Sequence, residues 1–189
     1  MSGGARMTGS APVTDAGFHE EWFGPESQAA LADLYDKVSD LEGDVVEVGC
    51  WEGRSTVALA NACYPTTVRA VDTWLGSPGE ISFKLAAERD VYAQFLTNVE
   101  EQTAGNVIPF EMGWDEYFCK HAGPTRFLHI DAEHSYGQVR GNIEAALPHM
   151  VPGGIICGDD NHHPPVREAV SDVLGNAYLI ATLWWWVKP

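Results

Sequence analysis

The stretch Val45–Gly53 reads VVEVGCWEG and leads into Ser55–Cys63, which reads STVALANAC. The apolar run before Gly49 predicts a strand that is covered on both faces, and the alanines and spaced aliphatics after it predict a helix packed on a sheet. Glycines at positions 49 and 53 let the backbone approach a ligand, and the N–H groups that open the helix face the space above the strand end. The stretch therefore predicts a strand, a turn and a helix, with a ligand site at the turn.

The spacing Glu-x-Gly-x-x-x-Gly differs from the Gly-x-Gly-x-x-Gly of nicotinamide sites. A diphosphate would favour N–H groups without a nearby acid, whereas an acid at the strand end suits a positively charged ligand such as an amino acid's ammonium group. This motif resembles the first motif of the class I S-adenosylmethionine-dependent methyltransferases. The resemblance implies that the methionine end of that cofactor is held by Glu47, Gly49, Cys50, Trp51, Gly53 and Ser55. Glycines that serve only tight packing are the alternative.

A second predicted strand, residues 67–72, ends on Asp72. An acid at this strand tip is placed to accept both hydroxyls of a ribose. Asp72 and Thr73 resemble the ribose-binding acid of the family and the residues near the adenine. After a third short strand, Gly113 and Trp114 occupy the position where the family contacts the adenine ring, although many relatives carry a small polar residue where Trp114 stands.

Two further predicted strands, residues 126–131 and 152–160, also end in carboxylates. Parallel strands end at the same rim, and neighbouring strands lie about 4.8 Å apart, so Asp131, Asp159 and Asp160 should converge near the glycine turn. Three acids held so close repel one another unless they are protonated or joined by a cation. Carboxylates without cysteine or paired histidine suit a hard ion, such as Mg²⁺ or another divalent cation.

This arrangement resembles the metal-dependent O-methyltransferases, especially the sugar and natural-product branch related to the macrolide O-methyltransferases. Their acid at the end of the fourth strand and acidic pair at the end of the fifth correspond to Asp131, Asp159 and Asp160. His134 lies three residues past Asp131, and its intrinsic pKa of ~6.5 suits proton removal from a metal-bound hydroxyl. Its position also matches the presumed base of these relatives. Acids that only cap helices or solvate loops are the alternative.

The resemblance runs from Glu21 to the end of the chain and implies a three-layer α/β, Rossmann-like methyltransferase fold with a mostly parallel central sheet. Residues 1–17 are rich in glycine, serine, alanine and threonine, which predicts a flexible N-terminal segment before a single methyltransferase domain over residues 18–189. Helical spacing of apolar residues predicts a helix over residues 26–41. Residues 75–88 are a longer connection than a crossover needs, which suits either a lid or a solvated loop.

The C-terminal stretch from Tyr178 to Val187 is rich in β-formers and contains the run Trp184–Trp186. Strand alternation sends Trp184 and Trp186 to one face and Trp185 to the other. We expect these side chains to be buried under flanking helices, with a subunit contact as the alternative. No turn signal separates a sixth from a seventh strand, so the final hairpin of this fold is expected to be shortened.

The charge and residue composition of the chain limit the classes of partner that it can bind. The 189 residues include 11 basic and 27 acidic side chains, a formal net charge of -16, which repels phosphate backbones and anionic lipid. We therefore expect neither nucleic acid nor membrane as a partner. Without an apolar span or a signal-peptide pattern, a cytoplasmic location is expected. The scattered cysteines, Cys50, Cys63, Cys119 and Cys157, are expected to be buried thiols.

Together these patterns predict methyl transfer from S-adenosylmethionine to an oxygen of a small-molecule hydroxyl acceptor, such as a sugar, a phenol or a polyketide, with metal assistance. Three alternatives remain. A metal-free N- or O-methyltransferase would share everything up to Asp72. A hydroxylase-like enzyme would need a redox iron and a cosubstrate. A non-catalytic binding module would use Trp184–Trp186 as its contact surface. Fold likeness alone does not settle chemistry. The oligomeric state stays open, with a homo-oligomer as one option.

Overall fold

A computed structural model describes residues 13–189 and contains one seven-stranded sheet between helical layers. Within these residues the elements in chain order are α1 (Pro25–Asp36), β1 (Asp44–Val48), α2 (Arg54–Cys63), β2 (Val68–Asp72), α3 (Ile81–Glu88), α4 (Val91–Gln102), β3 (Val107–Glu111), α5 (Trp114–Lys120), β4 (Thr125–Ile130), α6 (Tyr136–Ala146), the 3-10 helix η1 (Leu147–His149), β5 (Met150–Gly158), α7 (Pro164–Leu174), β6 (Tyr178–Ile180) and β7 (Leu183–Val187).

The strand order is β3-β2-β1-β4-β5-β7-β6. The strands β1 to β5 are parallel, and β7 is antiparallel to both β5 and β6. The chain proceeds outward from β1 to β3 and then returns to place β4 on the other side of β1. Open parallel sheets bind ligands where the strand order reverses, beyond the carboxyl ends of the strands. The topology therefore directs attention to the ends of β1 and β4.

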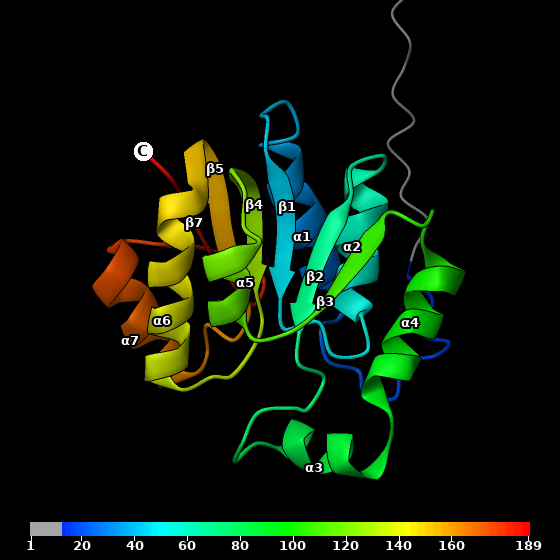
Figure 1. Cartoon of the computed structure of the whole chain (residues 1–189). Helices are drawn as coiled ribbons and strands as arrows, with labels where there is room; N and C mark the ends of the chain where they lie inside the picture. The colour runs from blue at the N-terminus through cyan, green and yellow to red at the C-terminus, as the bar shows by residue number, and fades with distance from the viewer. Residues whose placement is uncertain (1–12) are drawn as a thin grey trace, which may run out of the picture.

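Helices cover both faces of the sheet, as Figure 1 shows. One face carries α1 and α2, whose Leu31, Leu34 and Leu59 are buried against Val45 and Phe127 of the sheet. The helices α5, α6 and α7 pack over the opposite face in a second core. This arrangement confirms the predicted three-layer, Rossmann-like α/β fold with a mostly parallel sheet.

One element boundary differs from the sequence expectation. The first helix ends at Asp36 rather than near residue 41, because the chain passes into turns in which Val38 and Leu41 donate to the carbonyls of Tyr35 and Val38. Val38 lies beyond the end of the helix, but its side chain still packs into the core. The final hairpin is present and short, with a three-residue β6.

The tryptophan run alternates as predicted. Trp184 is 1% exposed and lies in the core under α6 and α7, and Trp186 packs against the same core. Trp185 packs against the core on the opposite face. Trp185 and Trp186 are only partly buried.

The predicted flexible segment, residues 1–17, lies partly outside the described residues, which begin at residue 13. The described part, residues 13–17, lies along α4: Thr14 donates from its backbone N–H to Gln102, and Asn98 donates to the carbonyl of Gly17. Within residues 13–189, no helix combines the length and apolar character that crossing a membrane would require.

Candidate active site

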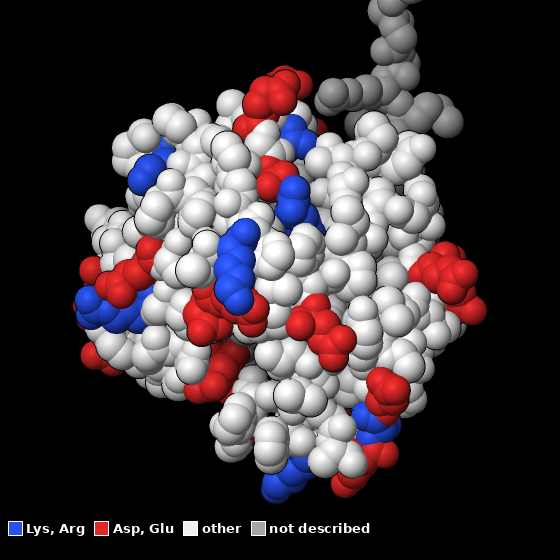
Figure 2. All heavy atoms as spheres, viewed as in Figure 1, with Lys and Arg blue, Asp and Glu red and all other residues white. Residues whose placement is uncertain are grey.

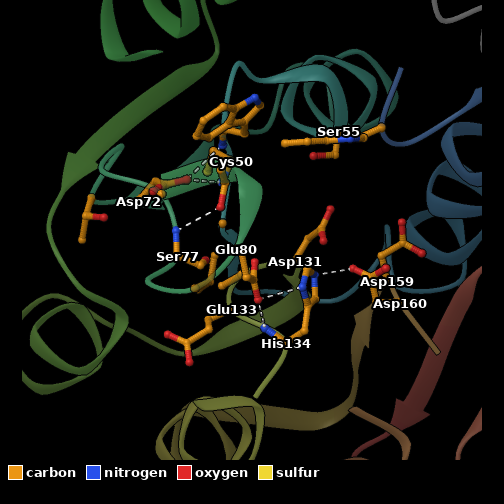
Figure 3. A pocket seen from close by; sticks show the side chains of 18 of the residues that line it. Cys50, Ser55, Asp72, Ser77, Glu80, Asp131, Glu133, His134, Asp159 and Asp160 are labelled. Atoms are coloured by element: carbon orange, nitrogen blue, oxygen red, sulfur yellow. Dashed lines mark hydrogen bonds and ion pairs between the residues drawn. The ribbon is translucent and has the colours of Figure 1, made fainter. Parts of the chain in front are cut away.

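A cavity of about 790 Å³ lies at the carboxyl ends of the strands. Figure 3 shows side chains that face it from the turn after β1, the end of β2 and the loops after β4 and β5. The lining includes most of the residues singled out in the sequence: Gly49, Cys50, Trp51, Ser55, Asp72, Thr73, Gly113, Trp114, Asp131, His134, Asp159 and Asp160. Glu47 and Gly53 are the two that do not line it.

Asp72 fixes the turn after β1. Its Oδ2 accepts hydrogen bonds from the backbone N–H groups of Cys50 at 2.7 Å and Trp51 at 2.9 Å, while Oδ1 accepts from the N–H of Trp74 at 2.8 Å. Burial raises the pKa of this carboxyl above its usual value despite these bonds. Because an ionised carboxylate offers about four acceptor positions, these three bonds leave about one position on Asp72 for a ligand hydroxyl.

Gly49 brings the turn after β1 into contact with the loop after β4. Its φ is +85°, and a Cβ added there would lie 2.0 Å from the carbonyl oxygen of Asp131. The register Val48↔Ile130 places the two loops side by side. Glycine is therefore required for close approach as well as for backbone conformation. Gly53 also has a positive φ, +89°, and a Cβ there would meet the Phe95 ring at 3.0 Å.

Glu47 does not face the cavity, which corrects its expected role at the methionine end. Its side chain is fully buried, accepts a hydrogen bond from the Thr56 hydroxyl, and lies with Oε1 3.0 Å from Nδ1 of His129. Its strand neighbours Val46 and Val48 pack in the core of α5, α6 and α7, so alternation turns Glu47 toward the α2 face. Burial opposes the imidazolium, but the hydrogen bond and charge of Glu47 raise the pKa of His129 above 6.5.

Asp131, His134 and Asp160 come together at the rim, with one possible ligand atom from each lying within 4.8 Å of the others. Nε2 of His134 is 2.6 Å from Oδ2 of Asp160, and this bond raises the pKa of His134 to about 9. Burial and then the charge of Asp159 raise the pKa of Asp131 to about 8. The predicted crowding of acids is therefore present, and a histidine shares it.

Asp159 takes a less central place than predicted. It belongs to no such group of three among the described residues, but its Oδ1 atom is buried and has no hydrogen-bond partner there. A second group joins Asp160 with His162 and His163, whose Nε2 atoms each lie 3.8 Å from Oδ1 of Asp160. The sequence analysis did not single out these two histidines, although their position shortly after the acidic pair is a local signal. Asp160 adopts a φ of 61°, a strained conformation that is common at functional sites.

A family model described as a methyltransferase domain matches residues 46–161, a span that contains the turn after β1 and both acidic strand ends. The chain belongs to this methyltransferase family. Its members are S-adenosylmethionine-dependent enzymes, as the resemblance of the motifs implied. The comparison with curated proteins finds no match.

Solved structures share the fold of this methyltransferase. The O-methyltransferase NovP is 19% identical with a TM-score of 0.69, and the similarity covers 87% of this chain and 80% of NovP. The calicheamicin methyltransferase CalS11 is 16% identical with a TM-score of 0.71, covering 87% of this chain and 80% of that one. An O-methyltransferase from Bacillus cereus in complex with SAH is 17% identical with a TM-score of 0.62, covering 87% and 82%.

Two further walls of the cavity of the methyltransferase come from segments outside the strand ends. The segment before α1 contributes Phe18, Glu20, Trp22 and Phe23. Phe23 also packs in the core beside α1. The loop before α3 contributes the second wall: Gly76, Ser77, Pro78, Glu80, Ile81 and Ser82.

An ion-pair network joins these two walls. Nη2 of Arg89 lies 2.5 Å from Oε2 of Glu20 and 2.9 Å from Oε1 of Glu52. Glu52 also accepts from the backbone N–H and Nδ1 of His19 at 2.8 Å each. The hydrogen bond to Glu20 and the charge of Glu52 raise the pKa of Arg89. The network connects the N-terminal segment, the turn after β1 and the end of α3.

Proposed function

We propose that this methyltransferase transfers the methyl group of S-adenosylmethionine to a hydroxyl oxygen of a small molecule, with a divalent cation held at Asp131, Asp159 and Asp160. The observation that carries the proposal is the close approach of Gly49 to the Asp131 carbonyl, which makes the turn after β1 and the acidic rim two walls of one cavity. At about 790 Å³ the cavity is within the usual range for small-molecule sites, about 300–1,000 Å³.

The cofactor half is formed by groups fixed before a ligand arrives. Asp72 is held by three backbone N–H groups and keeps about one acceptor position for a ribose hydroxyl. The backbone of Gly49 to Trp51 and the side chain of Ser55 line the space above β1, where the methionine end is expected. Gly113 and Trp114 line the side beyond β3, where we place the adenine. Pre-formed groups of this kind orient a ligand without much reorganisation on binding.

The acidic rim fits a hard divalent cation. Asp159 has a buried Oδ1 without a partner in the described residues, and its charge contributes to the raised pKa of Asp131. A positive ion between them would relieve both features, and oxygen donors suit Mg²⁺ or Mn²⁺. A bound cation supplies charge that lowers the pKa of an acceptor hydroxyl. We assign His134 the removal of the hydroxyl proton because its ring lines the cavity, and this role requires the ring to give up the proton that its contact with Asp160 stabilises.

The charge of the cavity supports a small uncharged or cationic acceptor, such as a sugar, a phenol or a polyketide. The only arginine among the described residues of its lining is Arg54, which is paired with Asp15. Nine acidic residues line it: Glu20, Glu52, Asp72, Glu80, Asp115, Asp131, Glu133, Asp159 and Asp160. Acidic side chains also border the hollow near α3 on the face that Figure 2 shows. Such a surface repels nucleic acid and anionic lipid.

The test is methyl transfer by the full chain to a panel of sugar, phenol and polyketide hydroxyl compounds, followed by mass spectrometry, with added Mg²⁺ or with a chelator. We expect a methylated hydroxyl product that disappears on chelation and in His134→Ala. The matched control is His121→Ala, because His121 is exposed and lies outside the cavity lining. Full activity in the presence of the chelator would contradict the role proposed for the metal. Activity of His134→Ala would contradict the role of His134 as the base.

A further inference from the structure

The segment from residue 75 to residue 90, which contains α3, lies apart from the helical layers. Figure 1 shows α3 beyond the carboxyl ends of β1 and β2, on the open side of the sheet. Every residue of this described segment is exposed or partly exposed, whereas Trp74 before it and Val91 after it are buried. A segment with few buried apolar contacts opens at low free energy. Its position over the cavity is therefore maintained by a small number of polar contacts.

Both ends of the segment are anchored. At the first end, Nε1 of Trp74 donates to the carbonyl of Trp51 at 2.8 Å, and the Trp74 ring lies 4.8 Å from that of Phe95. At the second end, Arg89 is held by Glu20 and Glu52. Anchored ends with a poorly buried middle are the features of a lid that moves about two hinges.

One residue of this segment reaches across the cavity. Glu80, at the start of α3, accepts the backbone N–H of His134 on Oε1 at 3.0 Å, and the same oxygen lies 3.0 Å from Nδ1 of the His134 ring. Nε2 of that ring faces Asp160 at 2.6 Å. Figure 3 shows the ring between the two carboxylates. The lid and the metal rim therefore contact opposite nitrogens of one histidine.

The two nitrogens of a histidine ring have separate roles, because the partner of one nitrogen determines which form the other adopts. A carboxylate that accepts from Nδ1–H fixes the orientation of the ring, as in serine hydrolases. Glu80 holds Nδ1 of His134 in this way, although it lies more than fifty residues earlier in the chain.

We propose that Glu80 is a positioning residue, and that covering of the cavity by residues 75–90 fixes the His134 ring at the acidic rim. The proposal rests on the role of His134 in the proposed function. In the covered state Glu80 accepts from Nδ1 and the backbone N–H of His134 while Nε2 faces Asp160, so that the ring is fixed at the acidic rim. When the segment opens, both contacts are lost and the ring is free to rotate. Enclosure of the acceptor and orientation of the base would thus occur together.

The experiment uses the ligand-free full chain with Glu80→Ala, Glu80→Gln and Glu88→Ala. Glu88 is the matched control because it is exposed on the same helix and contacts no charged partner among the described residues. Amide hydrogen exchange of His134 reports the backbone contact, and nitrogen NMR of its ring, assigned with His134→Gln, reports the contact at Nδ1. We expect Glu80→Ala to speed exchange of the His134 amide about tenfold and to shift its Nδ1 resonance. Glu80→Gln, which keeps an acceptor oxygen, should retain most of the amide protection, and Glu88→Ala should match the wild type.

An unchanged His134 amide and ring in Glu80→Ala would overturn the proposal, since an exposed ion pair of no consequence predicts that result. The kinetic readout is separate. With an accepted hydroxyl compound, Glu80→Ala should lower kcat and leave the KM for S-adenosylmethionine unchanged. A wild-type kcat in that variant would refute positioning while methyl transfer stands. Absence of turnover in the wild type would refute methyl transfer and leave the NMR result on the lid contact intact.

Discussion

Glu47 and His129 form a fully buried pair between two neighbouring strands, with Oε1 of Glu47 3.0 Å from Nδ1 of His129. The pair lies directly below the turn after β1, so it supports the site from inside the core. Glu47→Ala would leave the imidazole without its buried partner, and breaking such pairs costs about 3–5 kcal/mol. We predict a loss of that order in the free energy of unfolding, measured with a denaturant. Glu42→Ala, at an exposed position before the same strand, is the control and should change little.

The same pair predicts a pH dependence. Because Glu47 raises the pKa of His129 in the folded protein, its contribution to stability is fully present below the unfolded value of about 6.5. That contribution declines as the pH rises through the raised pKa. The difference in unfolding free energy between the wild type and Glu47→Ala should therefore be larger at about pH 6 than at about pH 9. A difference that grows with pH would show that the pair does not hold His129 as an imidazolium.

Much of the site followed from sequence because a strand end is a local signal. The acids at Asp72, Asp131 and Asp159 each close an apolar run, and parallel topology alone gathers such ends at one rim. The close approach at Gly49 was likewise expected from a glycine directly after a buried strand. The structure places these residues around one cavity.

The remaining features depend on contacts between distant segments, which spacing does not encode. Glu47 was assigned to a ligand because its partner lies on β4, and no local pattern links it to His129. Glu20 and Trp22 line the cavity through the path of the chain before α1. Glu80 reaches His134 only because α3 lies over the rim.

The cysteines also show where spacing gives no information. Cys50, Cys63 and Cys157 are buried as expected, but Cys119 is exposed near the end of α5, which corrects the expectation for that residue. Burial raises the pKa of Cys63 to about 12, and it raises those of Cys50 and Cys157 well above the usual value. Thiolates are the reactive form. We predict that iodoacetamide alkylates Cys119 in the native protein and spares the other three, as read by peptide mass spectrometry. Rapid labelling of Cys157 would contradict the buried arrangement.

Asp159 gives a direct test of the metal site. Asp159→Asn removes a hard ligand and also removes the charge that raises the pKa of Asp131. We predict that the affinity for Mn²⁺, measured by calorimetry on the ligand-free chain, falls at least about tenfold, while the unfolding free energy without metal stays equal or rises. Glu168→Gln, exposed on α7, should leave both unchanged. Equal Mn²⁺ affinity in Asp159→Asn would exclude this carboxylate as a ligand.

The most direct test of the whole account is calorimetric titration of the full chain with S-adenosylmethionine. The wild type should bind it, and Asp72→Ala should bind at least about tenfold more weakly, because a charged hydrogen-bond partner of both the ligand and the turn is lost. Glu111→Ala is the control, since Glu111 pairs with Asp72 in the sheet register but is exposed on the edge strand. Absence of binding by the wild type would contradict the account, and equal binding by Asp72→Ala would place the cofactor elsewhere.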